Sequence, residues 1–393
     1  MNAPPHNAEG APPRGPGDTP ARDPASAPPH GLGAPPPPGP VSTPLRGMTW
    51  DHPRAWRPLD AFDATTVTWD RQPLAGFEAH PITDLAIRYD LLVIDHPGLG
   101  AAVAGNALLP LDEVFTPAEL AAWAATSVGP TWDSYLFAGR QWALPIDAAT
   151  QVTTLRPGLS APRAWDEVPD FAARHATALC LAGPHAFLGL LAMHAAWTGA
   201  PTGWTPRLDV LTDAIALLHR TWQHTDGAIL DPIDIHARIA AGTLDHCPLV
   251  YGYAQYAGPV TWADAPSWGG ARTPGTVLGG TGLALARRAA DRLDDVRDYI
   301  RRFMTDAVQT ELIPAHGGQP AHTSVWDGPG YYAATRTSVE AAYRRPRFDG
   351  WIGFQDEASA LTRDAITGAR APEETARTLI DRYNDLRKES TDE

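Results

Sequence analysis

Residues 45–54 read LRGMTWDHPR, and this stretch decides the fold that the sequence predicts. Residues 45–50 are a short run of strand-forming side chains. The run ends at the tripeptide Asp-His-Pro, because proline lacks the N–H that would continue a β-ladder. The same tripeptide, at 95–97, follows a second apolar run at 89–94. Since polar groups at the carboxyl ends of strands lie where open α/β sheets bind ligands, the sequence predicts one crevice floored by two Asp-His pairs.

The segments that follow alternate between helical and strand patterns. Helical patterns at 56–65 and 74–87 lie on either side of a short strand pattern at 67–69. Such alternation is typical of a parallel sheet with helices on both faces. Residues 116–119, Thr-Pro-Ala-Glu, have the signature of a capping box at the start of a helix. From residue 163 on, helical patterns dominate, and the last of them spans 372–386.

Composition excludes several function classes. The chain has 393 residues, which favours two domains or lobes. Its net charge of −14 argues against a nucleic-acid partner, because phosphate binding needs dense lysine and arginine. Lys388 is the only lysine and lies in a charged C-terminal stretch, so Schiff-base chemistry lacks a good nucleophile. Cys180 and Cys247 are expected to be buried free thiols rather than a disulfide.

The first 43 residues are rich in proline, glycine and alanine, and we expect this segment to be a disordered tail. No basic start followed by an apolar run and a cleavage site is visible, and no cysteine near the start could carry a lipid anchor. No apolar run is long enough to span a membrane. As written, the chain is expected to be cytoplasmic; it would be extracellular only if the start codon were misassigned.

Seven segments after residue 44 resemble one known family. Residues 139–145, GRQWALP, are similar to its Gly-Lys-x-Tyr-x-x-Pro hairpin, and residues 162–167, PRAWDE, to its Pro-x-Thr-Trp-x-Glu helix start. The order of all seven resembles the extracellular solute-binding proteins (family 1) of ABC importers, of the sugar-binding, maltose-binding-protein-like type. The other five segments are 89–95, 108–112, 241–253, 279–285 and 317–320.

The resemblance implies an α/β, periplasmic-binding-protein-like (type II) fold, in which two α/β lobes are joined by a hinge and hold the ligand in a cleft. It places lobe 1 at 44–147 plus 263–315, and lobe 2 at 148–262 plus 316–390. The chain departs from the family in two respects. It shows no export signal, and the repeated Asp-His-Pro is not a general family feature.

The two strand ends supply the first set of candidate ligand-binding residues. An indole can stack on a ligand, a carboxylate can accept hydroxyl groups, and cations can bind anions. Asp51 could instead merely cap the following helix. The four Asp-His residues could also ligate zinc, but their spacing does not favour it, and we predict no metal and no cofactor. These candidates are Trp50, Asp51, His52, Arg54, Asp95 and His96.

A second set of candidates lies later in the chain. Asp147 and Gln151 fall at the expected lobe crossover, where polar groups bond either ligand or backbone. Aromatic residues near a strand end or in loops could stack on the apolar face of a sugar, although any one of them could instead belong to the core. The remaining candidates are Tyr251, Tyr253, Trp268, Gly280 and Trp326.

The leading functional hypothesis is reversible binding of a small polar molecule, sugar-like or carboxylated, with an ABC permease as a partner if the chain is exported. The alternative is a cytoplasmic enzyme that uses the same cleft for elimination, isomerisation or cyclisation. His52, Asp51, His96 and Asp95 would then act as acid and base. The enzyme requires an imidazole that reaches a carboxylate on one side and the open cleft on the other.

Overall fold

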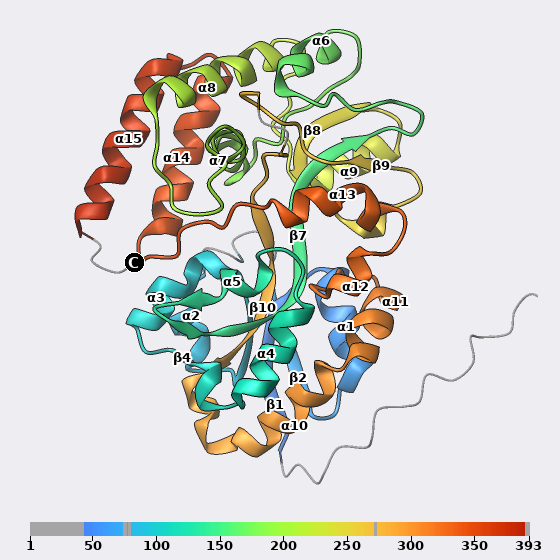
Figure 1. Cartoon of the computed structure of the whole chain (residues 1–393), viewed down its shortest axis with the longest axis vertical. Helices are drawn as coiled ribbons and strands as arrows, with labels where there is room; N and C mark the ends of the chain where they lie inside the picture. Colours follow the sequence, from blue (N-terminus) through green and yellow to red (C-terminus); the bar gives the residue numbers. More distant parts are fainter. Residues whose placement is uncertain (1–42, 74–76, 78–79, 271–272, 390–393) are drawn as a thin grey trace, which may run out of the picture. The chain divides into compact units, whose positions relative to one another are not determined.

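An eight-stranded sheet runs through the chain, in the order β2-β1-β3-β10-β7-β8, with β4 beside β10 and β9 beside β7 (Figure 1). The computed structural model describes residues 43–73, 77, 80–270 and 273–389. The strands of this sheet are β1 (Leu45–Trp50), β2 (Val67–Gln72), β3 (Leu91–Ile94), β4 (Leu108–Leu109), β7 (Ala143–Leu155), β8 (His246–Tyr251), β9 (Thr261–Ala263) and β10 (Leu278–Ala286).

Strand directions agree with the parallel pairing predicted for the first three strands and differ further along the chain. β1 pairs in parallel with β2 and β3, whereas β10 is antiparallel to β3, β4 and β7. The parallel prediction is thus confirmed for β1, β2 and β3, whereas the antiparallel direction of β10 was not predicted. The reason is that the chain leaves the first strands along β7 and returns along β10, so the returning strand runs the opposite way.

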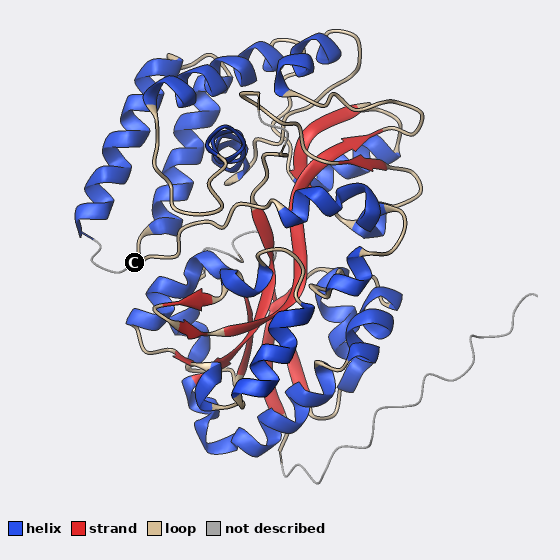
Figure 2. Ribbon diagram, viewed as in Figure 1, coloured by secondary structure: helices blue, strands red, loops and turns tan. Residues whose placement is uncertain are grey.

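The helices pack into two halves that share β7 and β10 (Figure 2). The first half has a core of β1, β3, β10 and α10, and the second half has a core built mainly from α7, α8, α14 and α15. The helices are α1 (Pro53–Asp63), α2 (Ile82–Ala86), α3 (Leu99–Ala104), α4 (Pro117–Thr126), α5 (Thr131–Ser134), α6 (Val168–Ala172), α7 (His185–Thr198), α8 (Leu208–Trp222), α9 (Pro232–Ala240), α10 (Leu293–Phe303), α11 (Ile313–Ala315), α12 (Thr323–Trp326), α13 (Tyr331–Glu340), α14 (Trp351–Ile366) and α15 (Pro372–Glu389).

β7 connects the two halves over 13 residues. Its first residues pair with β10, and its last residues pair with β8 and β9. Packing differs from the predicted lobe boundary at residue 263. Ala265 and Val277 are buried in the cluster of α7 and α8, because the chain returns to the first half only with β10.

Several local predictions are confirmed. β1 has the predicted bounds, and the Thr116–Glu119 capping box is present at the start of α4. The predicted helix at 74–87 lies partly outside the described residues, and α2 covers its last part. Cys180 and Cys247 are buried and form no disulfide. Within the described ranges, no helix combines the length and the apolar character needed to cross a membrane.

Candidate functional site

A cavity of about 680 Å³ lies where β7 and β10 pass between the two halves. Strand ends and helix starts from both halves form its walls. The lining from the first half and the shared strands includes Trp50, Arg54, Asp95, Asp147, Gly280 and Thr281. The lining from the second half includes His185, Leu188, Asp231, Tyr251, Tyr253, Arg345, Gln355 and Asp356.

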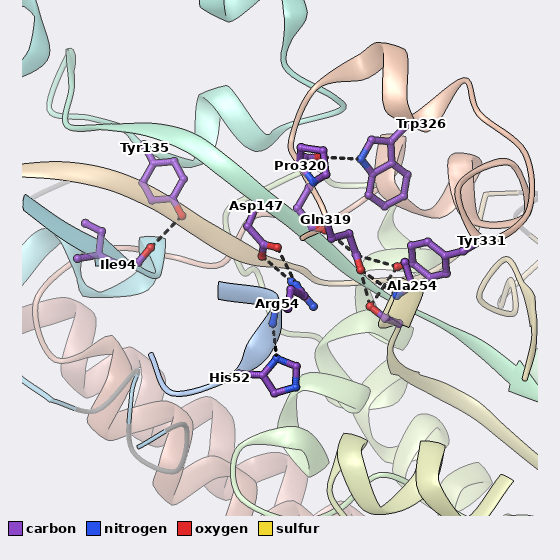
Figure 3. Close-up of polar contacts among 12 residues, drawn as sticks. His52, Arg54, Ile94, Tyr135, Asp147, Ala254, Gln319, Pro320, Trp326 and Tyr331 are labelled. Atoms are coloured by element: carbon purple, nitrogen blue, oxygen red, sulfur yellow. Dashed lines mark hydrogen bonds and ion pairs between the residues drawn. The ribbon is translucent and has the colours of Figure 1, made fainter. Parts of the chain in front are cut away.

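An ion pair between Arg54 and Asp147 forms part of the cavity wall (Figure 3). Arg54 Nε donates to Asp147 Oδ1 at 2.7 Å and Nη2 donates to Oδ2 at 2.5 Å, with side-chain exposures of 3% and 11%. The guanidinium carbon lies 4.8 Å from the ring centre of Tyr253, which favours the cation through the ring quadrupole. Burial lowers the pKa of Arg54, but its charge attraction and hydrogen bonds to Asp147 contribute to a net rise, so the guanidinium stays charged.

A second pair joins Asp95 to Arg345. Arg345 Nη2 donates to Asp95 Oδ2 at 2.7 Å, and the backbone N–H of His96 donates to Asp95 Oδ1 at 2.8 Å. Burial raises the pKa of Asp95, but Arg345 and His96 together outweigh that effect and hold the pKa at about 2. Both cavity arginines therefore have a carboxylate partner.

The two predicted Asp-His pairs do not floor the cavity. Of their four residues only Asp95 lines it, while Asp51 is exposed to solvent. Because Pro53 begins a helix directly, His52 turns inward as the N-cap of α1, and its Nδ1 accepts from the Arg54 N–H at 3.2 Å. Burial lowers the pKa of His52 to about 4, so its imidazole is neutral near pH 7.

His96 has a carboxylate on one side but no open cleft on the other. Its Nδ1 lies 3.0 Å from Asp95 Oδ1, and its buried Nε2 has no hydrogen-bond partner among the described residues. Burial lowers the pKa of His96 to about 4. Neither His52 nor His96, the two imidazoles that the acid–base hypothesis requires, lies in the cavity wall. In the described part of the chain, no three His, Cys, Asp or Glu side chains come together in a metal-binding group.

Three other sequence candidates lie outside the cavity lining. Gln151 is buried and accepts the Val277 N–H at 3.1 Å, so it bonds backbone at the crossover. Trp268 packs against the core of α7 and α8. Trp326 is 1% exposed and lies in α12 rather than in a loop, with its Nε1 donating to the Pro320 carbonyl at 2.9 Å.

Sequence reasoning missed four titratable residues of the lining: His185, Asp231, Arg345 and Asp356. His185 falls in a helical pattern, where a histidine carries no functional signal; it is the first residue of α7, and burial lowers its pKa to about 4. Asp231 precedes a proline as a helix cap does, and it caps α9. The cluster of arginines at 344–347 was the one signal for Arg345. Asp356 gave no signal.

No protein-family profile matches the sequence, and no curated protein sequence matches it. Several solved structures, however, are similar to this chain. Maltose-bound MalE3 of T. maritima has a TM-score of 0.71 and 16% identity, over 87% of this chain and 99% of the other. The chain has the type II periplasmic-binding-protein fold.

Two further structures with this fold match equally well. An ABC-transporter solute-binding protein of Thermotoga lettingae TMO, bound to α-D-tagatose, has a TM-score of 0.71 and 15% identity, over 88% and 99% of the two chains. One from Agrobacterium radiobacter K84, in complex with ribitol, has a TM-score of 0.71 and 14% identity, over 88% and 98%. At these identities the likeness shows the fold alone.

In this type II fold, the Gln319 side chain forms hydrogen bonds to two backbone segments beside the cavity, at Ala148 and Ala254 (Figure 3). Its Nε2 donates to the Ala148 carbonyl of β7 at 2.7 Å and to the Tyr331 hydroxyl at 2.9 Å, and its Oε1 accepts from the Ala254 N–H at 3.1 Å. At 1% exposed, Gln319 fixes the strand that carries Asp147 and the segment that carries Tyr253.

Proposed function

We propose that the chain reversibly binds a small, hydroxyl-rich molecule in the cavity between its two halves. The observation that supports this proposal is the composition of the cavity wall, which contains both aromatic rings and hydrogen-bonding groups. Rings of Trp50, Tyr251 and Tyr253 can pack on the C–H face of a sugar. The Thr281 and Tyr253 hydroxyls and the Asp231 carboxylate can bond to its hydroxyl groups.

The cavity volume of about 680 Å³ lies in the range of small-molecule sites. Proteins that share the fold are described in complex with maltose, α-D-tagatose and ribitol, all of which are neutral and rich in hydroxyl groups. These three ligands were bound by the other proteins, and for this chain they support only the proposed class of ligand. If the chain is exported, we propose that it delivers the ligand to an ABC permease. The cytoplasmic location of the chain stays a prediction.

Native mass spectrometry of the purified chain, followed by calorimetric titration with mono- and disaccharides, tests the proposal. A bound hydroxylated molecule that is released unaltered is the expected result. Chemical change of the molecule during incubation would favour the enzyme alternative. No binding of any sugar or polyol at about 1 mM, where even weak complexes form, would overturn the proposal.

Tyr253→Ala tests the aromatic wall. Loss of the ring should weaken binding about tenfold, which corresponds to about 1.4 kcal/mol and matches a good aromatic contact. Tyr256→Ala is the matched control, because Tyr256 lies three residues further on and outside the described cavity lining. Equal losses in the two variants would contradict a ligand-stacking role for Tyr253.

A further inference from the structure

Charge balance in the cavity narrows the ligand class beyond the proposed function. The charged side chains of the described lining are four aspartates and two arginines. Each arginine is engaged by a carboxylate, Arg54 by Asp147 and Arg345 by Asp95. His185 adds no positive charge near pH 7, because burial lowers its pKa to about 4. An anionic ligand therefore finds no cation in this lining that lacks a carboxylate neighbour.

Two carboxylates of the same cavity, Asp231 and Asp356, have no cationic partner among the described residues. Asp231 has a structural explanation, since its Oδ1 accepts the Asp234 N–H at 2.8 Å as the cap of α9. The positive end of that helix also offsets its charge. Asp356 has no such explanation. Within the described chain its side chain makes no hydrogen bond and no ion pair, and its partial desolvation raises the pKa of its carboxyl.

The start of α14 does not neutralise Asp356 either. The helix begins at Trp351, so Asp356 lies beyond its first turn, where the effect of the helix dipole fades. Asp356 is exposed and lines the cavity, so its carboxylate is open to a ligand cation and has no partner within the described residues. A protonated amine is the ligand group that would supply the missing charge and up to three N–H donors.

Two other residues of the same lining have buried donors. Trp50 and Arg54 line the cavity and are each 4% exposed, and Trp50 Nε1 and Arg54 Nη1 are buried donors without an acceptor among the described residues. Buried donors without acceptors are costly, so a ligand oxygen that reaches Trp50 Nε1 or Arg54 Nη1 would be stabilising.

We propose that the ligand carries a protonated amine in addition to its hydroxyl groups, and that the ammonium group binds Asp356. The ligand class is thus an amino sugar or aminopolyol, rather than an acidic sugar. This inference rests on the proposed function, because it assumes that the cavity binds a hydroxylated molecule. It replaces the carboxylated ligand that the sequence left open.

Matched sets of probes test the charge preference. D-glucose, D-glucosamine, N-acetyl-D-glucosamine and D-glucuronate, with the corresponding galactose series, are titrated into the full chain by calorimetry. The amine forms should bind at least about tenfold more tightly than the neutral forms, because a charge-assisted hydrogen bond contributes more than a neutral one. The acidic forms should bind most weakly.

The possible outcomes separate the two proposals. Neutral and amine forms that bind equally, or acidic forms that bind best, would overturn the amine inference and leave the proposed function standing. If no member of the panel binds at about 1 mM, both proposals are overturned.

Asp356→Asn locates the interaction. Affinity for the amine probe should fall by about ten- to a hundredfold, the range for a hydrogen bond between charged groups, and affinity for the neutral probe should change little. Asp364→Asn is the matched control on the same helix, because Asp364 is exposed like Asp356 but lies outside the described cavity lining. An amine preference that survives in Asp356→Asn would place the ammonium elsewhere and overturn the assignment.

Discussion

Arg54 is a buried cation whose place in the structure depends on one carboxylate. It follows Pro53 at the start of α1 and reaches Asp147 in β7, which lies 93 residues further along the chain. A buried charge is tolerated when it is paired and becomes costly when its partner is removed. The pair therefore links the first helix to the strand that joins the two halves.

We expect Asp147→Asn to lower the free energy of unfolding by about 3–5 kcal/mol, because Arg54 would stay buried without a counter-charge. Urea denaturation measures the change. Asp385→Asn is the control, since Asp385 pairs with Lys388 at the surface, where such a pair contributes less than about 1 kcal/mol. The double variant Arg54→Met/Asp147→Asn should recover part of the loss. A double variant less stable than Asp147→Asn alone would contradict the unpaired-charge explanation.

Candidate residues close to a predicted strand end could be found from the sequence. Trp50, Arg54 and Asp95 were predicted in this way, and all three line the cavity. Side-chain direction could not be predicted, because a helix that begins at Pro53 turns His52 inward and leaves Asp51 exposed. Residues such as Arg345 and Asp356 reach the cavity through contacts between distant segments, which local patterns do not encode.

At the scale of elements, the approach of β10 to β7 depends on Gly280. Gly280 has a φ of +98°, and a Cβ at this position would lie 2.3 Å from the Asp147 carbonyl oxygen. The register between the two strands shifts just after it, between Thr281 and Gly282. Gly280 was predicted to bind ligand. It does line the cavity, and its backbone also allows the strand carrying Asp147 to pass close by.

Gly280→Ala should lower the free energy of unfolding by about 2 kcal/mol or more, because alanine is strained at this φ and meets backbone that cannot move aside. Gly353→Ala is the matched control. Gly353 lies in α14 with no atom within 4 Å of an added Cβ, so alanine there should be neutral or stabilise by up to about 1 kcal/mol. Thermal and urea unfolding measure both variants. A Gly280→Ala chain as stable as the unsubstituted one would contradict the close approach.

Element boundaries followed from the sequence where local chemistry sets them. The Thr116 capping box and the proline that follows β1 are local signals, and both mark element ends correctly. The direction of β10 is set by where the chain has travelled between residues 156 and 277. No periodicity in residues 278–286 distinguishes an antiparallel strand from a parallel one.

At the scale of the whole molecule, burial keeps several imidazoles neutral. Burial is the largest cause of the lowered pKa in each case, with values of about 4 for five of them and about 3 for the sixth. In the unfolded chain an imidazole has its ordinary pKa of about 6.5. These histidines are His52, His96, His185, His194, His236 and His246.

We expect the free energy of unfolding to fall as the pH drops from about 6.5 to about 4, because the unfolded chain binds protons at these imidazoles and the folded chain does not. Each histidine contributes a slope of up to about 1.4 kcal/mol per pH unit in that window. Urea unfolding between about pH 8 and pH 5 measures the slope, which should be near zero above pH 7. His246→Gln should reduce it, whereas His224→Gln, at an exposed position, should not. Constant stability from pH 7 to pH 5 would mean that the imidazoles are protonated as readily in the folded chain as in the unfolded one.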